Sequence, residues 1–304
     1  MSTRQKRAIA ASEPRHDSWV ESRLQTTHLL MLETVAGTGS TRLDDLMAYH
    51  FSQRGACMRA RLALSSAHAL GLPDRTCIAL AACCELIHNG SLLHDDIQDN
   101  AHERRGQVTA WREFDVNTAM CAGTFLLSAA YQILARLPSH CAELVGQVHR
   151  SSANLIGGQV RDLQATRDPL DLEMWVAVAR GKSGSLLALP LELSLIAAGQ
   201  FSSISMASAA GQSFAVAYQI IDDIADAETD LSRGQNNIIA VLLGQKLDYQ
   251  ESIKRARGLA QSNLLQACTH ARWLPGDSGL GLVDLCQQLS DAASLSLSEE
   301  VQAA

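Results

Sequence analysis

Apolar residues recur every three or four positions along most of the chain, and short runs of Gly, Pro and polar residues separate the segments that carry them. This spacing predicts amphipathic helices. No stretch alternates as a strand would, and no linker divides the chain, so the pattern predicts one all-α domain of about ten or more helices over residues 18–304, after a polar, loose leader at 1–17. Helices are expected at 29–37, 43–51, 58–74, 76–99, 117–138, 141–163, 173–199 and 204–231, and again from Asn236 onward.

Composition supports a large helical core. The chain has 304 residues, 47% of them hydrophobic and only 4% aromatic, and segment 76–99 is apolar almost all round, as in a helix buried in a large α protein. A net charge of −7 gives no support to nucleic-acid binding. The eight cysteines show no C-x-x-C spacing, which indicates reduced thiols and a cytoplasmic protein without zinc. No apolar run reaches the roughly 18–20 residues of a membrane span, so none is expected.

Three aspartates, Asp95, Asp96 and Asp99, directly follow the apolar run of segment 76–99. On a helix, residues three and four apart share a side, so all three carboxylates can point the same way. Like charges at this spacing repel each other unless a cation lies among them. The plain alternative is a solvated helix end.

The same pattern returns after a second apolar run, as Asp222, Asp223 and Asp226. Two such clusters are best explained if they face each other across a cavity. Six carboxylates form a hard oxygen donor set that suits Mg²⁺, which usually completes its shell with water and substrate phosphates. Arg104 and Arg105 supply donors for phosphate oxygens, and Lys182, at an expected helix irregularity, adds a further positive charge. These residues predict a site for a metal-bound polyphosphate.

The order of the motifs in this chain resembles that of the trans-isoprenyl diphosphate synthases (polyprenyl synthetases) between about residues 50 and 235. The resemblance implies an isoprenoid-synthase bundle around a central apolar cavity, a homodimer, and condensation of an allylic diphosphate with isopentenyl diphosphate. The motifs are "LIHNGSLLHDDIQD" at 86–99, "RRGQVT" at 104–109, "GGQVRDL" at 157–163, "GKSG" at 181–184 and "YQIIDDIAD" at 218–226.

The resemblance also implies a role for each matching residue. The six aspartates become ligands of three Mg²⁺ ions, or the immediate supports of those ligands. The metals and nearby cations then stabilise the departing pyrophosphate, and a dry apolar cavity shelters the allylic cation. By the same resemblance, Arg104 and Lys182 hold the allylic diphosphate, Arg105, His88 and Arg59 hold isopentenyl diphosphate, and Gln159, Asp162 and Gln219 line the reacting zone.

Product length is expected to depend on residues four and five positions before Asp95, which are Ser91 and Gly90. Shorter-chain relatives tend to carry a bulky aromatic residue at the position of Gly90, so glycine there predicts an open shaft for the growing tail. Leu86 and Ile87, one turn of about 5.4 Å deeper, then close the shaft. This predicts the twenty-carbon product geranylgeranyl diphosphate. The alternative is that Gly90 merely permits close helix packing.

Two departures from the family pattern keep other functions open. The family opens its isopentenyl site with Gly-Lys-Arg-x-Arg-Pro, whereas this chain keeps Gly55 and Arg59 but has Ala56 and Cys57 between them. The loop after Asp226 is short and lacks the usual lysine. A terpene synthase that ionises a prenyl diphosphate without isopentenyl diphosphate is therefore the first alternative, and a subunit of a heteromeric prenyl synthase is the second.

Overall fold

The computed structural model of the protein describes residues 18–53, 55–165 and 171–295, and the predicted leader lies outside this part. Most of it is helical, which confirms the predicted fold class. The helices are α2 (Ser18–Val35), α3 (Thr41–Phe51), α4 (Met58–Ala69), α5 (Asp74–Gln98), α6 (Ala110–Glu113), α7 (Val116–Leu134), α8 (Cys141–Ala165), α9 (Leu172–Ala179), η1 (Arg180–Gly184), α10 (Ser185–Ala197), η2 (Phe201–Ser203), α11 (Ile204–Arg233), α12 (Ile238–Gly244), α13 (Tyr249–Arg272), η3 (Pro275–Asp277) and α14 (Leu280–Ala292).

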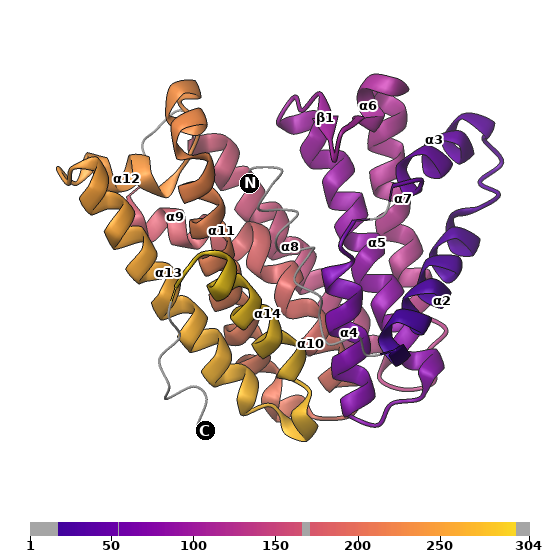
Figure 1. Ribbon diagram of the computed structural model, residues 1–304. Coiled ribbons are helices and arrows are strands. Elements are labelled where there is room, and N and C mark those ends of the chain that lie inside the picture. Colours follow the sequence, from indigo (N-terminus) through magenta and orange to yellow (C-terminus); the bar gives the residue numbers. More distant parts are fainter. Residues whose placement is uncertain (1–17, 54, 166–170, 296–304) are drawn as a thin grey trace.

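The helices form two halves that share α10. Helices α2, α5 and α7 lie in one half and α11, α13 and α14 in the other, with α8 and α10 between them (Figure 1). Because apolar residues surround α10 on all sides, it packs into both cores: Leu189 and Leu193 belong to the first, Leu191 and Leu195 to the second. The carboxyl ends of α5 and α11 both point to the upper end in Figure 1. The two aspartate motifs therefore lie at the same end of the molecule.

Helix α5 corrects one sequence-based expectation. By length and composition alone it is long enough and apolar enough to cross a membrane, although the apolar runs in the sequence predicted no membrane span. Within the described residues it is the core helix of the first half, and most of it is buried. Burial in a core accounts for the same composition, so this is weak support for a membrane span.

A short hairpin interrupts the helices between α5 and α6, where no strand was expected. Strands β1 (Glu103–Arg104) and β2 (Gln107–Val108) pair antiparallel, with Arg104 opposite Gln107. The two-residue turn between them places Arg105 (φ 57°) and Gly106 (φ 80°) in left-handed conformations, as a type I′ turn requires. Strands of two residues have no room for the alternating pattern that would have predicted them.

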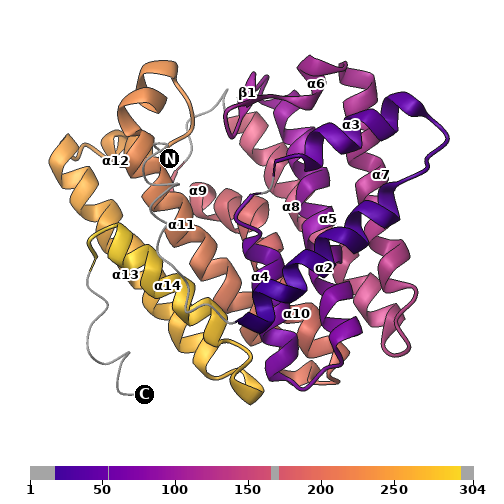
Figure 2. The ribbon, with the colours of Figure 1, turned by 45° about the vertical axis from the view of Figure 1, so that its right-hand side comes forward.

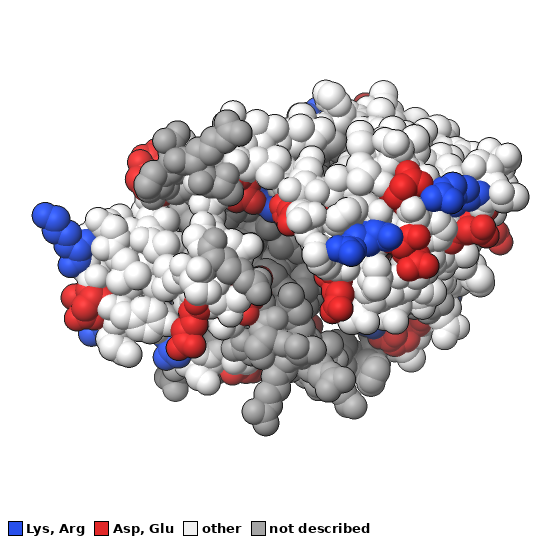
Figure 3. All heavy atoms as spheres, turned by 90° about the horizontal axis from the view of Figure 1, so that it is seen from above, with Lys and Arg blue, Asp and Glu red and all other residues white. Residues whose placement is uncertain are grey.

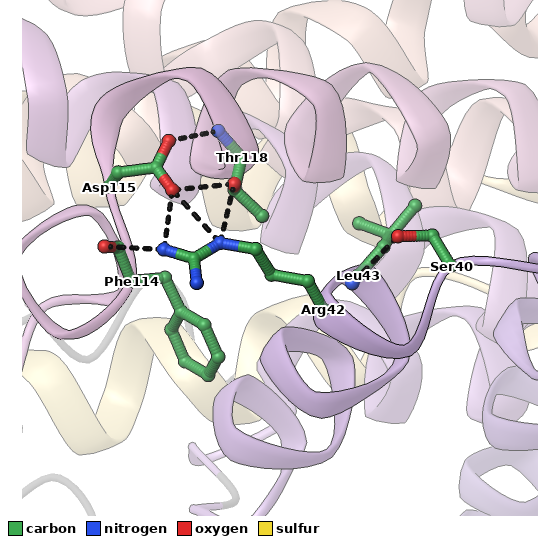
Figure 4. Close-up of polar contacts among 6 residues, drawn as sticks. All are labelled: Ser40, Arg42, Leu43, Phe114, Asp115 and Thr118. Atoms are coloured by element: carbon green, nitrogen blue, oxygen red, sulfur yellow. Dashed lines mark hydrogen bonds and ion pairs between the residues drawn. The ribbon is translucent and has the colours of Figure 1, made fainter.

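Helix α3 braces this end of the first half. The Arg42 guanidinium donates to the Asp115 carboxylate (Nη2 to Oδ2, 2.7 Å) and to the Phe114 carbonyl (3.0 Å), while Asp115 caps α7 by accepting from the Thr118 amide (2.8 Å; Figure 4). From the same helix, Tyr49 Oη donates to the Val108 carbonyl at 2.8 Å. Since β2 and the start of α7 are both anchored to α3, the hairpin that carries the two arginines has a fixed position.

Candidate active site

The first aspartate motif lies at the carboxyl end of α5. Asp96 is buried, Asp95 is half-buried and Asp99 is exposed. Burial raises the pKa of Asp95 to about 6; the charge of Lys182 opposes the rise, and Asp99 and Asp96 add to it. The three carboxylates do not act alike. Asp96 Oδ1 accepts from both Nε (2.7 Å) and Nη2 (2.6 Å) of Arg104, so Asp96 holds the hairpin arginine in place.

Lys182 occupies the irregularity that the sequence predicted, a single π-helical turn between α9 and α10. Its Nζ lies 2.7 Å from Oδ2 of Asp162 on α8. Burial lowers the pKa of Lys182, but Asp162, Asp99 and Asp95 together raise it above its usual value. The ammonium group is therefore charged and lies within electrostatic reach of the first aspartate motif.

Two glycines explain how this ion pair forms. A Cβ on Gly158 of α8 would lie 2.7 Å from the carbonyl carbon of Gly181, and a Cβ on Gly181 would lie 3.0 Å from the Cα of Gly158. The backbones of α8 and the π turn are thus in direct contact, which only residues without a side chain allow. This contact brings Lys182 to Asp162 and accounts for the glycines of "GGQVRDL" and "GKSG".

The second aspartate motif lies on α11, and its middle carboxylate has a structural task. Asp223 is buried, its Oδ1 accepts from Nε2 of Gln219 (2.8 Å), and its Oδ2 accepts from the amide of Ile238 (2.7 Å) at the start of α12. Burial raises the pKa of Asp223 to about 7, against the effect of these two bonds. With both oxygens engaged, Asp223 is a support for the motif, and its prediction as a direct metal ligand is not favoured. Asp222 and Asp226 are half-buried on the same helix.

A cavity of about 110 Å³ joins these groups. Asp162, Lys182, Gln219 and Asp223 all line it, together with Asn236. Seen from above, the surface is hollowed between the two halves, with acidic side chains along the rim (Figure 3). Lys182 thus adjoins both motifs, since the charges of Asp95 and Asp99 raise its pKa and it lines the same cavity as Asp223. The structure brings the two predicted clusters to one region.

The donor set fits magnesium. Among the described residues, no three His, Cys, Asp or Glu side chains come together as a group that could hold a metal ion by themselves. Mg²⁺ in proteins is usually held by one or two carboxylates together with substrate phosphates, so an open pair of clusters is the expected arrangement. Gln159, predicted to line the reacting zone, is buried on α8, and within the described part of the chain its side-chain amide has no hydrogen-bond partner. A buried amide of this kind indicates a place for a polar ligand.

A second group of predicted residues surrounds the start of α4. Glu85 accepts from the Ala60 amide at 3.0 Å, and Arg59 Nε is inaccessible and has no hydrogen-bond partner among the described residues. Burial lowers the pKa of His88 well below its usual value, and the charges of Arg59 and Arg105 lower it further, so the imidazole is neutral. The Arg105 guanidinium packs on Gly55, where an added Cβ would lie 2.8 Å from Nη1.

The expectation of open space beside Gly90 is wrong. A Cβ there would lie 2.9 Å from the Gly123 carbonyl oxygen and 3.4 Å from Leu126 Cβ, so α7 occupies this side of α5. Five residues along a helix correspond to about 140° of rotation, which turns Gly90 away from the face of Asp95. Ser91, four residues before Asp95, is buried near that face and donates to the His88 carbonyl at 2.8 Å.

Two residues that position the site lie outside its motifs and were not predicted from the sequence. Asn237 is fully buried, donates to the Asp223 carbonyl (2.8 Å) and to Asp230 (2.9 Å), and caps α12. Asn236 donates to Asp162 Oδ1 at 3.2 Å. An Asn directly before an apolar run is a helix-start signal that was available in the sequence, although its contact with Asp223 was not.

Comparison with known proteins agrees with this geometry. The chain is 29% identical over 203 residues to the nonaprenyl diphosphate synthase of Mycobacterium tuberculosis, a match covering 66% of this chain and only 60% of that relative. It is 30% identical over 238 residues to the geranylgeranyl diphosphate synthase of Cyanophora paradoxa, which covers 73% of this chain and 79% of the relative. The fold matches a crystal structure of geranylgeranyl pyrophosphate synthetase from Pyrococcus horikoshii with a TM-score of 0.81, at 24% identity over 92% of this chain and 98% of that one.

The sequence model of the polyprenyl synthetase family matches residues 40–239, about two thirds of the chain and every motif described above. With the shared fold and the two aspartate motifs placed beside one lysine, this match establishes that the chain belongs to the polyprenyl synthetase family.

Proposed function

We propose that the protein is a magnesium-dependent trans-prenyltransferase that joins an allylic diphosphate to isopentenyl diphosphate. The observation that carries the proposal is the position of Lys182, charged, paired with Asp162 and adjoining the aspartate motifs of both α5 and α11. Carboxylates on two helices around a fixed cation match the charge pattern of a metal-bound diphosphate.

In this proposal three magnesium ions per site are held by four aspartates, which are Asp95, Asp99, Asp222 and Asp226. Bound magnesium supplies electrostatic stabilisation of the departing pyrophosphate. The chain itself orients the allylic diphosphate through Lys182 and Arg104. Asp96 and Asp223 keep these groups in place through their bonds to Arg104 and to the start of α12.

We further propose a twenty-carbon product, with a different structural reason from the one based on Gly90. Ser91 is a small side chain near the Asp95 face, and Ile87, one turn deeper, is fully buried and large enough to end the space for a tail. Relatives include a nonaprenyl and a geranylgeranyl diphosphate synthase, so product length varies among proteins similar to this chain. The product spectrum on a reversed-phase separation of dephosphorylated alcohols tests the length.

A terpene synthase is the second candidate, and the composition of the other substrate pocket favours it. Ala56 and Cys57 stand where the family carries two cations, and both line a cavity of about 200 Å³ beside Arg105. A chain that binds isopentenyl diphosphate weakly can still ionise an allylic diphosphate, because that step uses the metal clusters with Lys182 and Arg104 and needs no second substrate.

One experiment separates these functions. Purified protein is incubated with Mg²⁺ and geranyl or farnesyl diphosphate, with and without labelled isopentenyl diphosphate. A longer labelled prenyl diphosphate supports chain elongation. A hydrocarbon or alcohol formed without isopentenyl diphosphate supports the terpene synthase. Product formation only after a second protein is added would indicate a heteromeric subunit, and would contradict both proposals.

Restoring the missing cation should improve the second substrate site. Since Ala56 is exposed and lines the cavity beside Arg105, Ala56→Lys places an ammonium group near the expected diphosphate. We expect the KM for isopentenyl diphosphate to fall by about tenfold, as one charge-assisted contact implies, with little change in the KM for the allylic substrate. Steady-state kinetics with each substrate varied in turn check this. An unchanged KM would contradict this prediction, because it would show that a side chain at position 56 does not contact the diphosphate.

We also propose a homodimer. Met120 on α7 and Ile156, Val160 and Leu163 on α8 are exposed apolar side chains, and those of α8 recur at helical spacing on one face. Such a stripe is typical of a surface that a second helix covers. Light scattering after size exclusion gives the oligomeric state, and Val160→Glu should shift a dimer toward monomer. A monomeric wild-type protein would contradict the proposal.

A further inference from the structure

The cavity of about 200 Å³ extends beyond the family motif to helix α2. Helix α2 crosses α4 and α5 (Figure 2). The cavity is lined by Gly55, Ala56 and Arg105 on one side and by Glu21 of α2 and Arg61 of α4 on the other. Two guanidinium groups thus face one space, one from the hairpin and one from the first turn of α4.

Arg61 has an ion-pair partner in the structure. Its Nη1 pairs with Oε1 of Glu21, and its Nε donates to the Ala56 carbonyl at 3.3 Å. The side chains are 34% and 37% exposed, respectively, so water reaches the pair and the pair can exchange partners at small cost. Arg61 lies two residues beyond Arg59, the last arginine of the family motif, and thus outside that motif.

We propose that Arg61 exchanges Glu21 for the diphosphate of the second substrate and takes the place of one of the two cations missing at Ala56 and Cys57. Arg61 and Arg105 then hold the diphosphate from opposite sides of the cavity, and Glu21 competes with it for Arg61. The inference rests on the proposed function, since it names the residues that bind its second substrate.

The charges lining the cavity give this exchange its direction. Arg61 and Arg105 are opposed by Glu21 and Glu85, and Glu85 is already bonded to the Ala60 amide. A diphosphate carries more negative charge than one carboxylate and offers oxygens for both nitrogens of a guanidinium fork, so it displaces Glu21 from Arg61. Removing the Glu21 charge should then strengthen binding, whereas removing the Arg61 charge should weaken it.

The test measures binding without turnover. Isopentenyl diphosphate is titrated calorimetrically into the full chain with EDTA present and no allylic substrate, so that neither condensation nor metal-dependent binding contributes. We expect Arg61→Gln to raise Kd by about tenfold or more, as loss of a charge-assisted contact implies. Glu21→Gln should lower Kd by about two- to fivefold, as loss of a competing surface ion pair implies. Because Glu21 acts through Arg61, the double variant should bind as weakly as Arg61→Gln.

Arg23→Gln is the matched control. Arg23 lies on α2 two residues from Glu21 and pairs with Asp74 at 2.6 Å with similar exposure, but it does not line the cavity. The Kd of Arg23→Gln for isopentenyl diphosphate should equal that of the wild type. Inorganic pyrophosphate in place of isopentenyl diphosphate should rank the Kd values of the variants in the same order, because the contacts are to the diphosphate. Circular dichroism verifies that each variant is folded.

The inference is overturned if Arg61→Gln leaves Kd unchanged or if Glu21→Gln raises Kd. It is also overturned if the wild type does not bind isopentenyl diphosphate. The outcome is separate from that of the proposed function. Chain elongation with an unaffected Arg61→Gln variant refutes only the role of Arg61. If the Kd values follow the expected order but the protein makes no product longer than its allylic substrate, the elongation reaction is refuted and the diphosphate site is still supported.

Discussion

Replacing Asp95 or Asp222 by alanine is expected to lower kcat by at least about 100-fold, as the loss of a group that stabilises developing charge implies, with little loss of stability. Each variant removes an oxygen donor for magnesium, and so weakens the positive charge that meets the departing pyrophosphate. The metal-free fold should tolerate the change, because burial and the neighbouring carboxylates already raise the pKa of Asp95 to about 6. Deleting a carboxyl group that is unfavourably placed when ionised does not destabilise the chain.

Two other aspartates serve as comparisons. Asp223→Ala should reduce both activity and melting temperature, because Asp223 is buried and bonded to Gln219 and to the Ile238 amide. Asp284→Ala, at an exposed position on α14, should change neither. Initial rates at saturating Mg²⁺ and thermal unfolding of all four variants give the answer. Near-wild-type turnover in Asp95→Ala or Asp222→Ala would falsify the two-cluster metal site.

Gly158→Ala is expected to lower activity by at least about tenfold, since small misplacements of positioning groups have effects of this size or larger. The Cβ of alanine would lie 2.7 Å from the carbonyl carbon of Gly181, and the nearest atoms are backbone that cannot rotate away. The π turn must therefore move off α8, and Lys182 moves with it, away from Asp162. Overpacking of this kind also destabilises a fold by about 1–3 kcal/mol.

The adjacent glycine makes a matched control. A Cβ on Gly157 meets no atom within 4 Å, so Gly157→Ala should leave activity unchanged and gain up to about 1 kcal/mol of stability, because alanine is the better helix former. Steady-state kinetics and chemical denaturation of both variants measure the difference. If Gly158→Ala matched Gly157→Ala in kcat, the contact between α8 and the π turn would have no part in placing Lys182.

The sequence by itself determined the class of fold and predicted the chemistry of the site. Apolar spacing of three and four residues has no stable solution except helices that bury one side, and α10 and α5, apolar all round, had to lie inside. The carboxylates at the end of α5 and within α11 predicted a site for a hard cation, because donor type and charge are properties of the residues themselves. Lys182 was also identified correctly at a helix irregularity, since Gly181 and Gly184 flank it.

Only the tertiary structure decided how these residues divide their tasks. Asp96 and Asp223 have the same side chain as Asp95 and Asp222, yet Asp96 binds Arg104 and Asp223 accepts from an amide at the start of α12. These partners come from other segments of the chain, which the local pattern does not specify. Gly90 faces α7 and not the cavity, since its surroundings depend on which helix packs there. The pairing of Arg61 with Glu21 joins residues 40 positions apart. Local sequence patterns show which groups are present, but only the packing of the helices determines which of them come into contact.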